Sequence, residues 1–238
     1  MALLELDDAT KRYGALRVVD GLSLHVDAGE VLGIVGPNGA GKTTALSMIA
    51  GDVALTQGAV RFDGEDITRM PAHARCRAGI GRTFQVPLPF LGMTVFENVV
   101  VGALHGGSGE GDAHAAAVKS LQRTGLLKDA NVPAARLTLL QRKRLELARV
   151  LVTEPRVVLI DESAGGLIEA EVHELLPTIL ALKEAGAAVI WIEHVVHALL
   201  AVADRMLAID RGRMIAEGDP HEVMNSRAVQ EVYLGAMA

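Results

Sequence analysis

Residues 36–44 read GPNGAGKTT, and this stretch decides which fold the sequence predicts. It matches G-x-x-x-x-G-K-[ST], a pattern in which glycines let backbone N–H groups crowd around phosphate oxygens. The apolar run 31–35 precedes it, and a helix is expected from Lys42 to about Ala50, with the positive end of its dipole at the loop. The residues expected to cradle phosphate are Gly36, Pro37, Asn38, Gly39, Ala40, Gly41, Lys42, Thr43 and Thr44. A chance glycine turn is the alternative, and the flanking strand and helix disfavour it.

Side chains of this loop and of one later strand have separate predicted tasks. Lys42 would reach the β- and γ-phosphates of a nucleotide, Thr43 would hold Mg²⁺, and Thr44 could donate its hydroxyl to an inner phosphate. The metal also needs a carboxylate at the end of a buried strand, and the run 157–162, VVLIDE, supplies one. Asp161 would hold Mg²⁺ through water, and Glu162 would orient or deprotonate the attacking water. An ordinary acidic strand end is the competing interpretation, and the loop upstream favours the catalytic one.

Strand-like and helix-like runs alternate along the chain, which is typical of an α/β protein. Strands are expected at 3–6, 23–26, 31–35, 59–62, 79–84, 157–160, 188–192 and 206–209. Helices without a convincing strand are expected between residues 87 and 155, at 95–104, 113–127 and 141–151, with a mobile glycine-rich loop at 105–111. The sequence therefore predicts a core formed by 1–86 and 156–238, and an inserted helical lobe formed by 87–155.

The composition excludes some classes of function. Half of the 238 residues are hydrophobic, which is enough for a sizeable core. The formal net charge of −6 argues against broad, sequence-independent binding of nucleic acid. The single cysteine, Cys76, allows no internal disulfide and fits a reducing compartment. The N-terminus carries acids where a signal peptide would carry basic residues, and the apolar stretch 187–209 contains ionisable residues, so neither a signal peptide nor a membrane span is predicted.

With these motifs, three further residues make nearly the whole chain resemble the ABC ATPase family. Tyr13, in KRYGALRVV, stands where the family keeps an aromatic that stacks on adenine, with a half-buried strand tyrosine as the alternative. Gln85, in GIGRTFQ, matches the family's Q-loop glutamine, which touches Mg²⁺ or water and senses the permease. His194, in WIEHVVHAL, matches the switch histidine that contacts the γ-phosphate. A metal pair of His194 and His197 is the alternative, without a third ligand at suitable spacing.

The resemblance implies the fold and the way of working. The expected fold is α/β, a P-loop NTPase core with an N-terminal antiparallel β lobe and an inserted helical lobe. Two such subunits would sandwich two ATP molecules with Mg²⁺, each between one P-loop and the opposing signature motif. Hydrolysis would drive membrane permease subunits docked near Gln85, with the ATPase attached peripherally to the cytoplasmic face of the inner membrane.

One family element departs from its pattern. The family expects L-S-G-G-Q, whose amides and serine grip the γ-phosphate on the partner subunit, and this chain has LTLLQ at 137–141. Thr138 can replace the serine hydroxyl and Gln141 keeps the glutamine, but Leu139 and Leu140 add bulk where nucleotide should approach closely. Ile168 stands where the family has its D-loop aspartate. The departure favours a different ATPase subunit as partner, with a homodimer as the alternative. Four basic residues follow, and they form either a solvated helix face or a group that tunes the phosphate site: Arg142, Lys143, Arg144 and Arg149.

Two stretches with less specific patterns indicate a subfamily. The stretch 81–106 and the run VQEVYLG at 229–235 resemble the ATPases of branched-chain amino acid importers, although similar ATPases serve other amides or lipopolysaccharide export. Two rival functions are a nucleotide-gated module with weak hydrolysis, which the altered signature favours, and an ABC ATPase acting on nucleic acid or ribosomes. The second rival usually carries tandem cassettes or long coiled-coil insertions, and this sequence shows neither.

Overall fold

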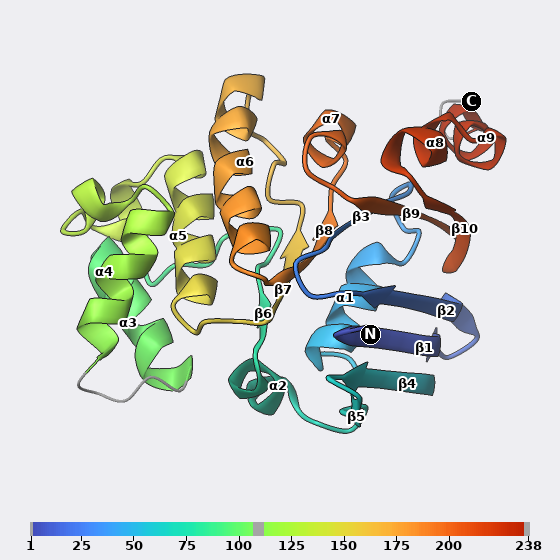
Figure 1. Cartoon of the computed structure of the whole chain (residues 1–238), viewed down its shortest axis with the longest axis horizontal. Helices are drawn as coiled ribbons and strands as arrows, with labels where there is room; N and C mark the ends of the chain where they lie inside the picture. Colours follow the sequence, from blue (N-terminus) through green and yellow to red (C-terminus); the bar gives the residue numbers. More distant parts are fainter. Residues whose placement is uncertain (1, 107–111, 236–238) are drawn as a thin grey trace.

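The computed structural model describes residues 2–106 and 112–235 and contains two β-sheets (Figure 1). The larger sheet has the strand order β10-β9-β3-β8-β7-β6, and its neighbours are parallel except β10 with β9. Its strands are β3 (Val31–Val35), β6 (Ile80–Arg82), β7 (Val157–Asp161), β8 (Ala188–Ile192), β9 (Arg205–Asp210) and β10 (Arg213–Gly218). Because parallel strands end at the same edge, the segments that follow β3, β7 and β8 gather there.

The smaller sheet is antiparallel, with the order β2-β1-β4-β5. Its strands are β1 (Leu4–Tyr13), β2 (Leu16–Val26), β4 (Gln57–Phe62) and β5 (Glu65–Asp66). The hairpin of β1 and β2 turns at Gly14, whose φ of 60° lies in the left-handed region that glycine adopts without strain. This sheet confirms the N-terminal antiparallel lobe of the predicted fold.

Helices cover both faces of the larger sheet. They are α1 (Lys42–Ala50), α2 (Ala72–Ala78), α6 (Glu169–Glu184), α7 (Val196–Leu200), α8 (Pro220–Asn225) and α9 (Arg227–Gly235). On one face, Leu32 and Ile34 pack in a cluster with α1 and the smaller sheet; on the other, Val35 and Trp191 pack with α6, α7 and α8. Every residue of β3, β7 and β8 is buried, which explains their continuous apolar sequences.

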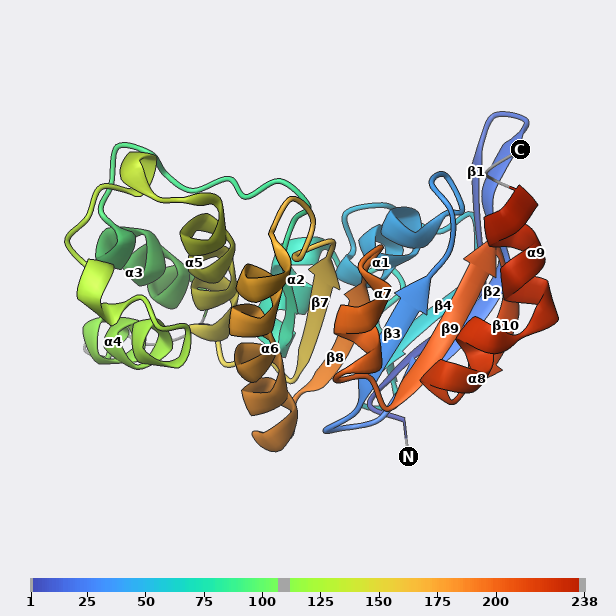
Figure 2. The same cartoon turned by 90° about the horizontal axis from the view of Figure 1, so that it is seen from above.

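A third apolar cluster lies among helices inserted between β6 and β7. Helices α3 (Val95–Gly106), α4 (Ala113–Arg123) and α5 (Leu139–Leu151) pack on one another, and Figure 2 shows them grouped at one end of the molecule. The inserted helical lobe is therefore present, while the dividing points at 86 and 155 stay predictions. Within 2–106 and 112–235, the structure contains no helix with the length and apolar character needed to cross a bilayer.

Several predicted boundaries are wrong. The strands expected at 3–6 and 23–26 are longer, at Leu4–Tyr13 and Leu16–Val26. The helix expected at 113–127 ends at Arg123, because Gly125 turns the chain with a φ of 70°. His105 and Gly106 continue α3 instead of beginning a loop, and the rest of that predicted loop, 107–111, lies outside the described residues. The strand expected at 79–84 is only Ile80–Arg82, because Gly79 still belongs to the turn that ends α2.

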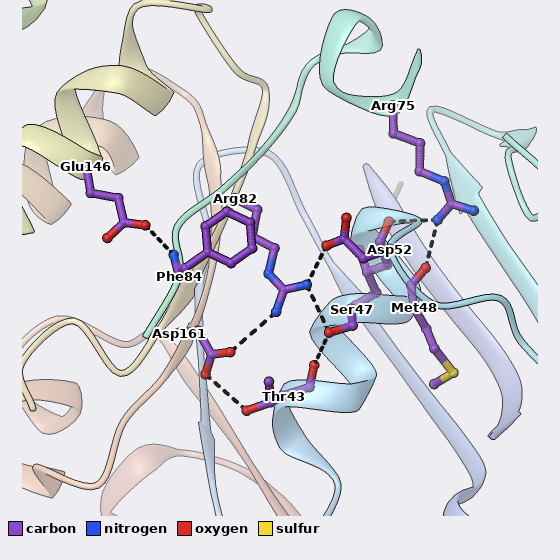
Figure 3. A network of polar contacts seen from close by, with 10 residues as sticks. Thr43, Ser47, Met48, Asp52, Arg75, Arg82, Phe84, Glu146 and Asp161 are labelled. Atoms are coloured by element: carbon purple, nitrogen blue, oxygen red, sulfur yellow. Dashed lines mark hydrogen bonds and ion pairs between the residues drawn. The ribbon is translucent and has the colours of Figure 1, made fainter. Parts of the chain in front are cut away.

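The C-terminal end of α1 is capped by a buried arginine from α2. The last carbonyls of a helix lack partners within it, and Arg75 Nη1 donates to two of them, Met48 O at 2.8 Å and Ile49 O at 2.7 Å. The same guanidinium donates through Nε to Met70 O and through Nη2 to Thr68 O, and the residue is 2% exposed. Figure 3 shows this contact of Arg75 with α1. Arg75 therefore fixes one end of the helix whose other end carries the phosphate loop.

We predict that Arg75→Lys lowers the free energy of unfolding by about 2–3 kcal/mol, because an ammonium group cannot reach four carbonyls and leaves buried acceptors unpaired. Urea denaturation measures the loss. The control is Arg77→Lys, an exposed arginine of the same helix, which should change stability little. Equal stability of the two variants would show that the cap contributes nothing.

Candidate active site

The loop between β3 and α1 is shaped by close backbone approaches. A Cβ at Gly36 would lie 2.1 Å from Ile209 O, and one at Gly41 would lie 2.5 Å from Val18 O, so both positions require glycine. The Gly36 N–H donates to Tyr233 Oη of α9 at 3.1 Å, and this hydrogen bond holds the start of the loop in place. Residues 38–44 of the loop line a cavity of about 160 Å³, and Val18 and Glu162 complete its lining. A concave backbone before a helix N-terminus is suited to an anion such as nucleotide phosphate.

Lys42 is the buried cation of this cavity. It is 5% exposed, and its Nζ donates to the carbonyls of Gly36 at 2.7 Å and Pro37 at 3.0 Å. Burial lowers the pKa of Lys42, and the charges of Glu162 and Asp161 oppose that shift. Because both acceptors are neutral carbonyls, the positive charge of Lys42 is available to an anion entering the loop.

Thr43 and Asp161 bring two oxygen ligands together. Thr43 Oγ1 donates to Asp161 Oδ1 at 3.3 Å, across the gap between α1 and β7 (Figure 3). Asp161 is 1% exposed; burial raises the pKa of its carboxyl group, and the guanidinium of Arg82 lowers it. A hydroxyl and a carboxylate are the hard oxygen donors that Mg²⁺ takes beside nucleotide phosphates, so this donor set fits the predicted metal.

Glu162 is the meeting point of the predicted catalytic residues. Gln85 Nε2 donates to Glu162 Oε2, and His194 Nε2 lies 2.9 Å from Glu162 Oε1. Glu162 has a φ of 49°, an uncommon conformation for a residue with a side chain and one that occurs often at functional sites. Its carboxylate also lines the phosphate cavity. Three residues chosen from distant parts of the sequence therefore converge beside the loop.

The other predicted binding residues lie elsewhere. Tyr13 ends β1 with 52% of its surface exposed and Lys11 Nζ 4.9 Å from its ring centre. Thr138 caps α5: its hydroxyl accepts from Gln141 N at 3.3 Å, and Gln141 Oε1 accepts from Thr138 N at 3.0 Å. This capping box uses both side chains within one chain. Neither Thr138 nor Gln141 lines the cavity at the P-loop, as expected of a motif that would act on a partner's nucleotide.

The two leucines of the altered signature have different environments. Leu140 is 8% exposed and points into the protein, whereas Leu139 is 42% exposed. Leu139 Cδ2 would lie 3.1 Å from a Cβ placed on Gly166, so it packs against the loop after β7. The expectation that both leucines add outward bulk is therefore wrong for Leu140, and Leu139 carries the exposed side chain.

Two buried charged residues lie near Glu162: Lys143, which the sequence placed either on a solvated helix face or among residues that tune the phosphate site, and Glu193, which sequence reasoning missed. Lys143 is 4% exposed and its Nζ donates to Glu162 O at 3.1 Å, so a solvated position is wrong for this lysine. Its spacing was a signal, because it lies three residues after buried Leu140 and four before buried Leu147. Glu193 is 1% exposed, and its Oε1 accepts from Ala164 N at 2.6 Å. Burial raises the pKa of Glu193.

A second missed residue is Arg82, in the phrase that contains Gln85. Its side chain is 10% exposed, and it pairs with Asp52 at 2.7 Å and with Asp161 at 3.5 Å (Figure 3). The short strand β6 places it between α1 and β7, a position that the sequence alone does not reveal.

Comparisons with known proteins agree with this geometry. The family described as "ABC transporter" matches residues 19–165, and the family "Branched-chain amino acid ATP-binding cassette transporter" matches residues 213–238. The high-affinity branched-chain amino acid transport ATP-binding protein BraF of Pseudomonas aeruginosa is 34% identical, in an alignment that covers 98% of each chain. The lipopolysaccharide export system ATP-binding protein LptB of Escherichia coli is 33% identical over 241 residues, covering 99% of this chain and 98% of LptB.

Solved structures agree as well. A crystal structure of the ADP conformation of an ATP-binding cassette of an ABC transporter matches with a TM-score of 0.91 and 30% sequence identity, covering 99% of both chains. A nucleotide-free cassette matches with a TM-score of 0.90 at 30% identity, covering 98% of this chain and 99% of that one.

The chain belongs to the ATP-binding subunits of ABC transporters. Members of this family bind nucleotide, hydrolyse ATP and couple hydrolysis to transport, together with membrane permease components. The predicted fold class and ATPase activity are thereby confirmed. The transported substance is left open, because BraF and LptB are almost equally similar to this chain.

The exposed ring of Tyr13 generates a prediction about the base. Tyr13→Ala should weaken ATP binding by about 1–3 kcal/mol, the range for base stacking on aromatic side chains. Tyr13→Phe is the matched control and should bind like the unaltered chain, because the ring face and not the hydroxyl makes the contact. Titration with ATP under non-hydrolysing conditions measures both. Unchanged affinity in Tyr13→Ala would make Tyr13 a structural residue of the hairpin.

Proposed function

We propose that this chain binds MgATP at residues 36–44 and hydrolyses it with Glu162 as the residue that acts on water. The observation that carries the proposal is the convergence of Gln85 and His194 on the Glu162 carboxylate, at the rim of the phosphate cavity. A carboxylate held on both oxygens has a fixed direction, which a group that orients or deprotonates water needs.

Each residue of the site has a role in this proposal. The backbone of residues 36–44 holds the phosphates, Lys42 neutralises their charge, and Thr44 donates to an inner phosphate. Thr43 and Asp161 hold Mg²⁺, which supplies charge stabilisation at the phosphates when bound, and Gln85 adds an oxygen near it. His194 contacts the γ-phosphate. Catalysis is then mostly positioning and charge stabilisation around the transferred phosphoryl group.

We predict that Glu162→Gln keeps ATP binding and lowers single-turnover hydrolysis about 10²–10⁴-fold, the usual contribution of a general base. Lys42→Ala should instead lose tight MgATP binding, because the phosphate charge loses its fixed cation. Glu65→Gln, an exposed glutamate of β5, is the control and should resemble the unaltered chain. Hydrolysis by Glu162→Gln at a near-normal rate would remove Glu162 from the mechanism.

We further propose that the chain powers import of branched-chain amino acids at the cytoplasmic face of the inner membrane. BraF and the family match at 213–238 support this substrate class. The alternatives are lipid export, which the similarity to LptB supports, and transport of another solute. The permease would dock near Gln85, beside a cavity of about 420 Å³ that Phe84, Val101, Glu146 and Val150 help to line. Purification from membranes with identification of the attached subunits distinguishes importer from exporter.

The partner ATPase is proposed to be a different subunit. In a homodimer, both ATP molecules would face Thr138 and exposed Leu139; in a heterodimer, a partner with glycines in its signature would complete the site on this chain's P-loop. Leu139 already packs beside Gly166 of its own chain, so its side chain narrows the space at that surface. A homodimer whose loop accommodates the leucine is the alternative, and weak hydrolysis by a nucleotide-gated module would follow if no better partner exists.

The isolated chain should therefore hydrolyse ATP slowly, and Leu139→Gly with Leu140→Gly should accelerate it wherever the homodimer forms. Because Leu140 is buried, Leu139→Gly alone is the variant least disturbed in folding, and Leu91→Gly, an exposed loop leucine, is the control. A concentration series of steady-state hydrolysis measures the effect. Brisk hydrolysis that rises with self-association and does not respond to either glycine variant would contradict the asymmetric partnership.

A further inference from the structure

Four residues form a closed ring of polar contacts around the predicted Mg²⁺ ligands (Figure 3). Thr43 Oγ1 donates to Asp161 Oδ1 at 3.3 Å, and Arg82 Nη2 contacts Asp161 Oδ2 at 3.5 Å. Arg82 Nη1 donates to Ser47 Oγ at 2.9 Å, and the Ser47 hydroxyl donates to Thr43 O at 2.7 Å, which closes the ring. The ring therefore joins the end of β7 to the first turn of α1 through one side chain of β6.

Arg82 uses one oxygen of Asp161 and leaves the other toward Thr43. The guanidinium contacts Oδ2, whereas Oδ1 faces the Thr43 hydroxyl. A cation that competed with Mg²⁺ would occupy the oxygen facing Thr43. The arrangement instead leaves Oδ1 facing the hydroxyl of Thr43, a residue that lines the phosphate cavity.

Other contacts fix Arg82 in this position. Its Nη1 also pairs with Asp52 Oδ2 at 2.7 Å, beyond the end of α1, and its guanidinium carbon lies 5.3 Å from the centre of the Phe84 ring. The side chain is 10% exposed and that of Asp161 is 2% exposed, so solvent screens the contact between these two residues little. The planar fork of arginine reaches α1 and Asp161 at once, which the single ammonium group of lysine cannot do.

We propose that Arg82 is a positioning residue for Mg²⁺: by closing the ring through Thr43, Asp161 and Ser47, it fixes the separation and direction of the two metal-holding side chains. This inference rests on the proposed MgATP site and adds a residue to which no function has been assigned. Outer residues that orient metal ligands typically change metal affinity about 10–100-fold when removed.

The test is equilibrium binding of ATP by the full chain, in excess EDTA and over a series of MgCl₂ concentrations. Every variant also carries Glu162→Gln, which prevents turnover. Arg82→Gln should leave ATP affinity in EDTA unchanged. It should raise the MgCl₂ concentration at which the enhancement of ATP binding is half-maximal by at least about tenfold. Arg82→Lys should behave like Arg82→Gln, because it keeps the charge but loses the fork. Ser47→Ala, which opens the ring without removing a charge, should give a smaller shift in the same direction.

The matched control is Arg156→Gln. Arg156 also pairs with a carboxylate, Asp63 at 2.7 Å, and lies over a phenyl ring, Phe62 at 5.2 Å, but it is half exposed and away from the ring of contacts. It should not shift the MgCl₂ dependence. Circular dichroism checks the fold of each variant, and Ser47→Ala keeps the test valid if the Arg82 variants do not fold.

Each result decides the question. A normal MgCl₂ dependence in Arg82→Gln and Ser47→Ala, a lower requirement for Mg²⁺, or full recovery in Arg82→Lys would overturn the positioning role. An equal loss of ATP affinity in EDTA and in MgCl₂ would show that Arg82 only supports the loop, which also overturns it. If the Glu162→Gln parent shows no Mg²⁺-dependent binding, the proposed MgATP site fails, which is distinguishable from failure of the Arg82 inference alone.

Discussion

The structure depends on holding both ends of helix α1 in place. At its N-terminus, Gly36 and Gly41 let the chain pass so close to Ile209 O and Val18 O that no other residue fits, and the resulting loop offers backbone amides to phosphate. At its C-terminus, Arg75 satisfies the last carbonyls from inside the core. The backbone amides of this loop have no freedom to adjust separately, so their geometry is as precise as the packing around α1.

Largely buried charged residues lie at the ends of β7 and β8 and on the neighbouring β6 and α5, and each contacts a charged or polar group. Asp161 faces the Thr43 hydroxyl and the guanidinium of Arg82, while Lys143 bonds the Glu162 carbonyl and its charge acts on Glu193. Isolated charges would be costly at such depth, so these residues come in complementary sets. The sets join β6, β7, β8 and α5 at one edge of the sheet, which gives elements distant in sequence a direct effect on the site.

Motifs with strict backbone demands were predictable from the sequence. The P-loop needs glycines at fixed positions, and β3, β7 and β8 are buried on both faces, so both left clear patterns. Arg82 left none, because a three-residue strand gives no periodicity from which to infer its direction. Leu139 and Leu140 look alike in the sequence, yet one packs beside Gly166 and the other enters the core; that difference depends on where α5 begins and on a loop far along the chain.

The central claim is that MgATP is held by the backbone of residues 36–44 with Asp161 and Glu162 at its side. Amide hydrogen exchange of the Glu162→Gln chain, with and without MgATP, tests it most directly, because bound phosphates accept hydrogen bonds from the loop amides. The account predicts that exchange slows strongly in peptides covering 36–44 and more weakly in those covering 157–162, with little change in the surface strand β5. Unchanged exchange at 36–44 in saturating MgATP would contradict it.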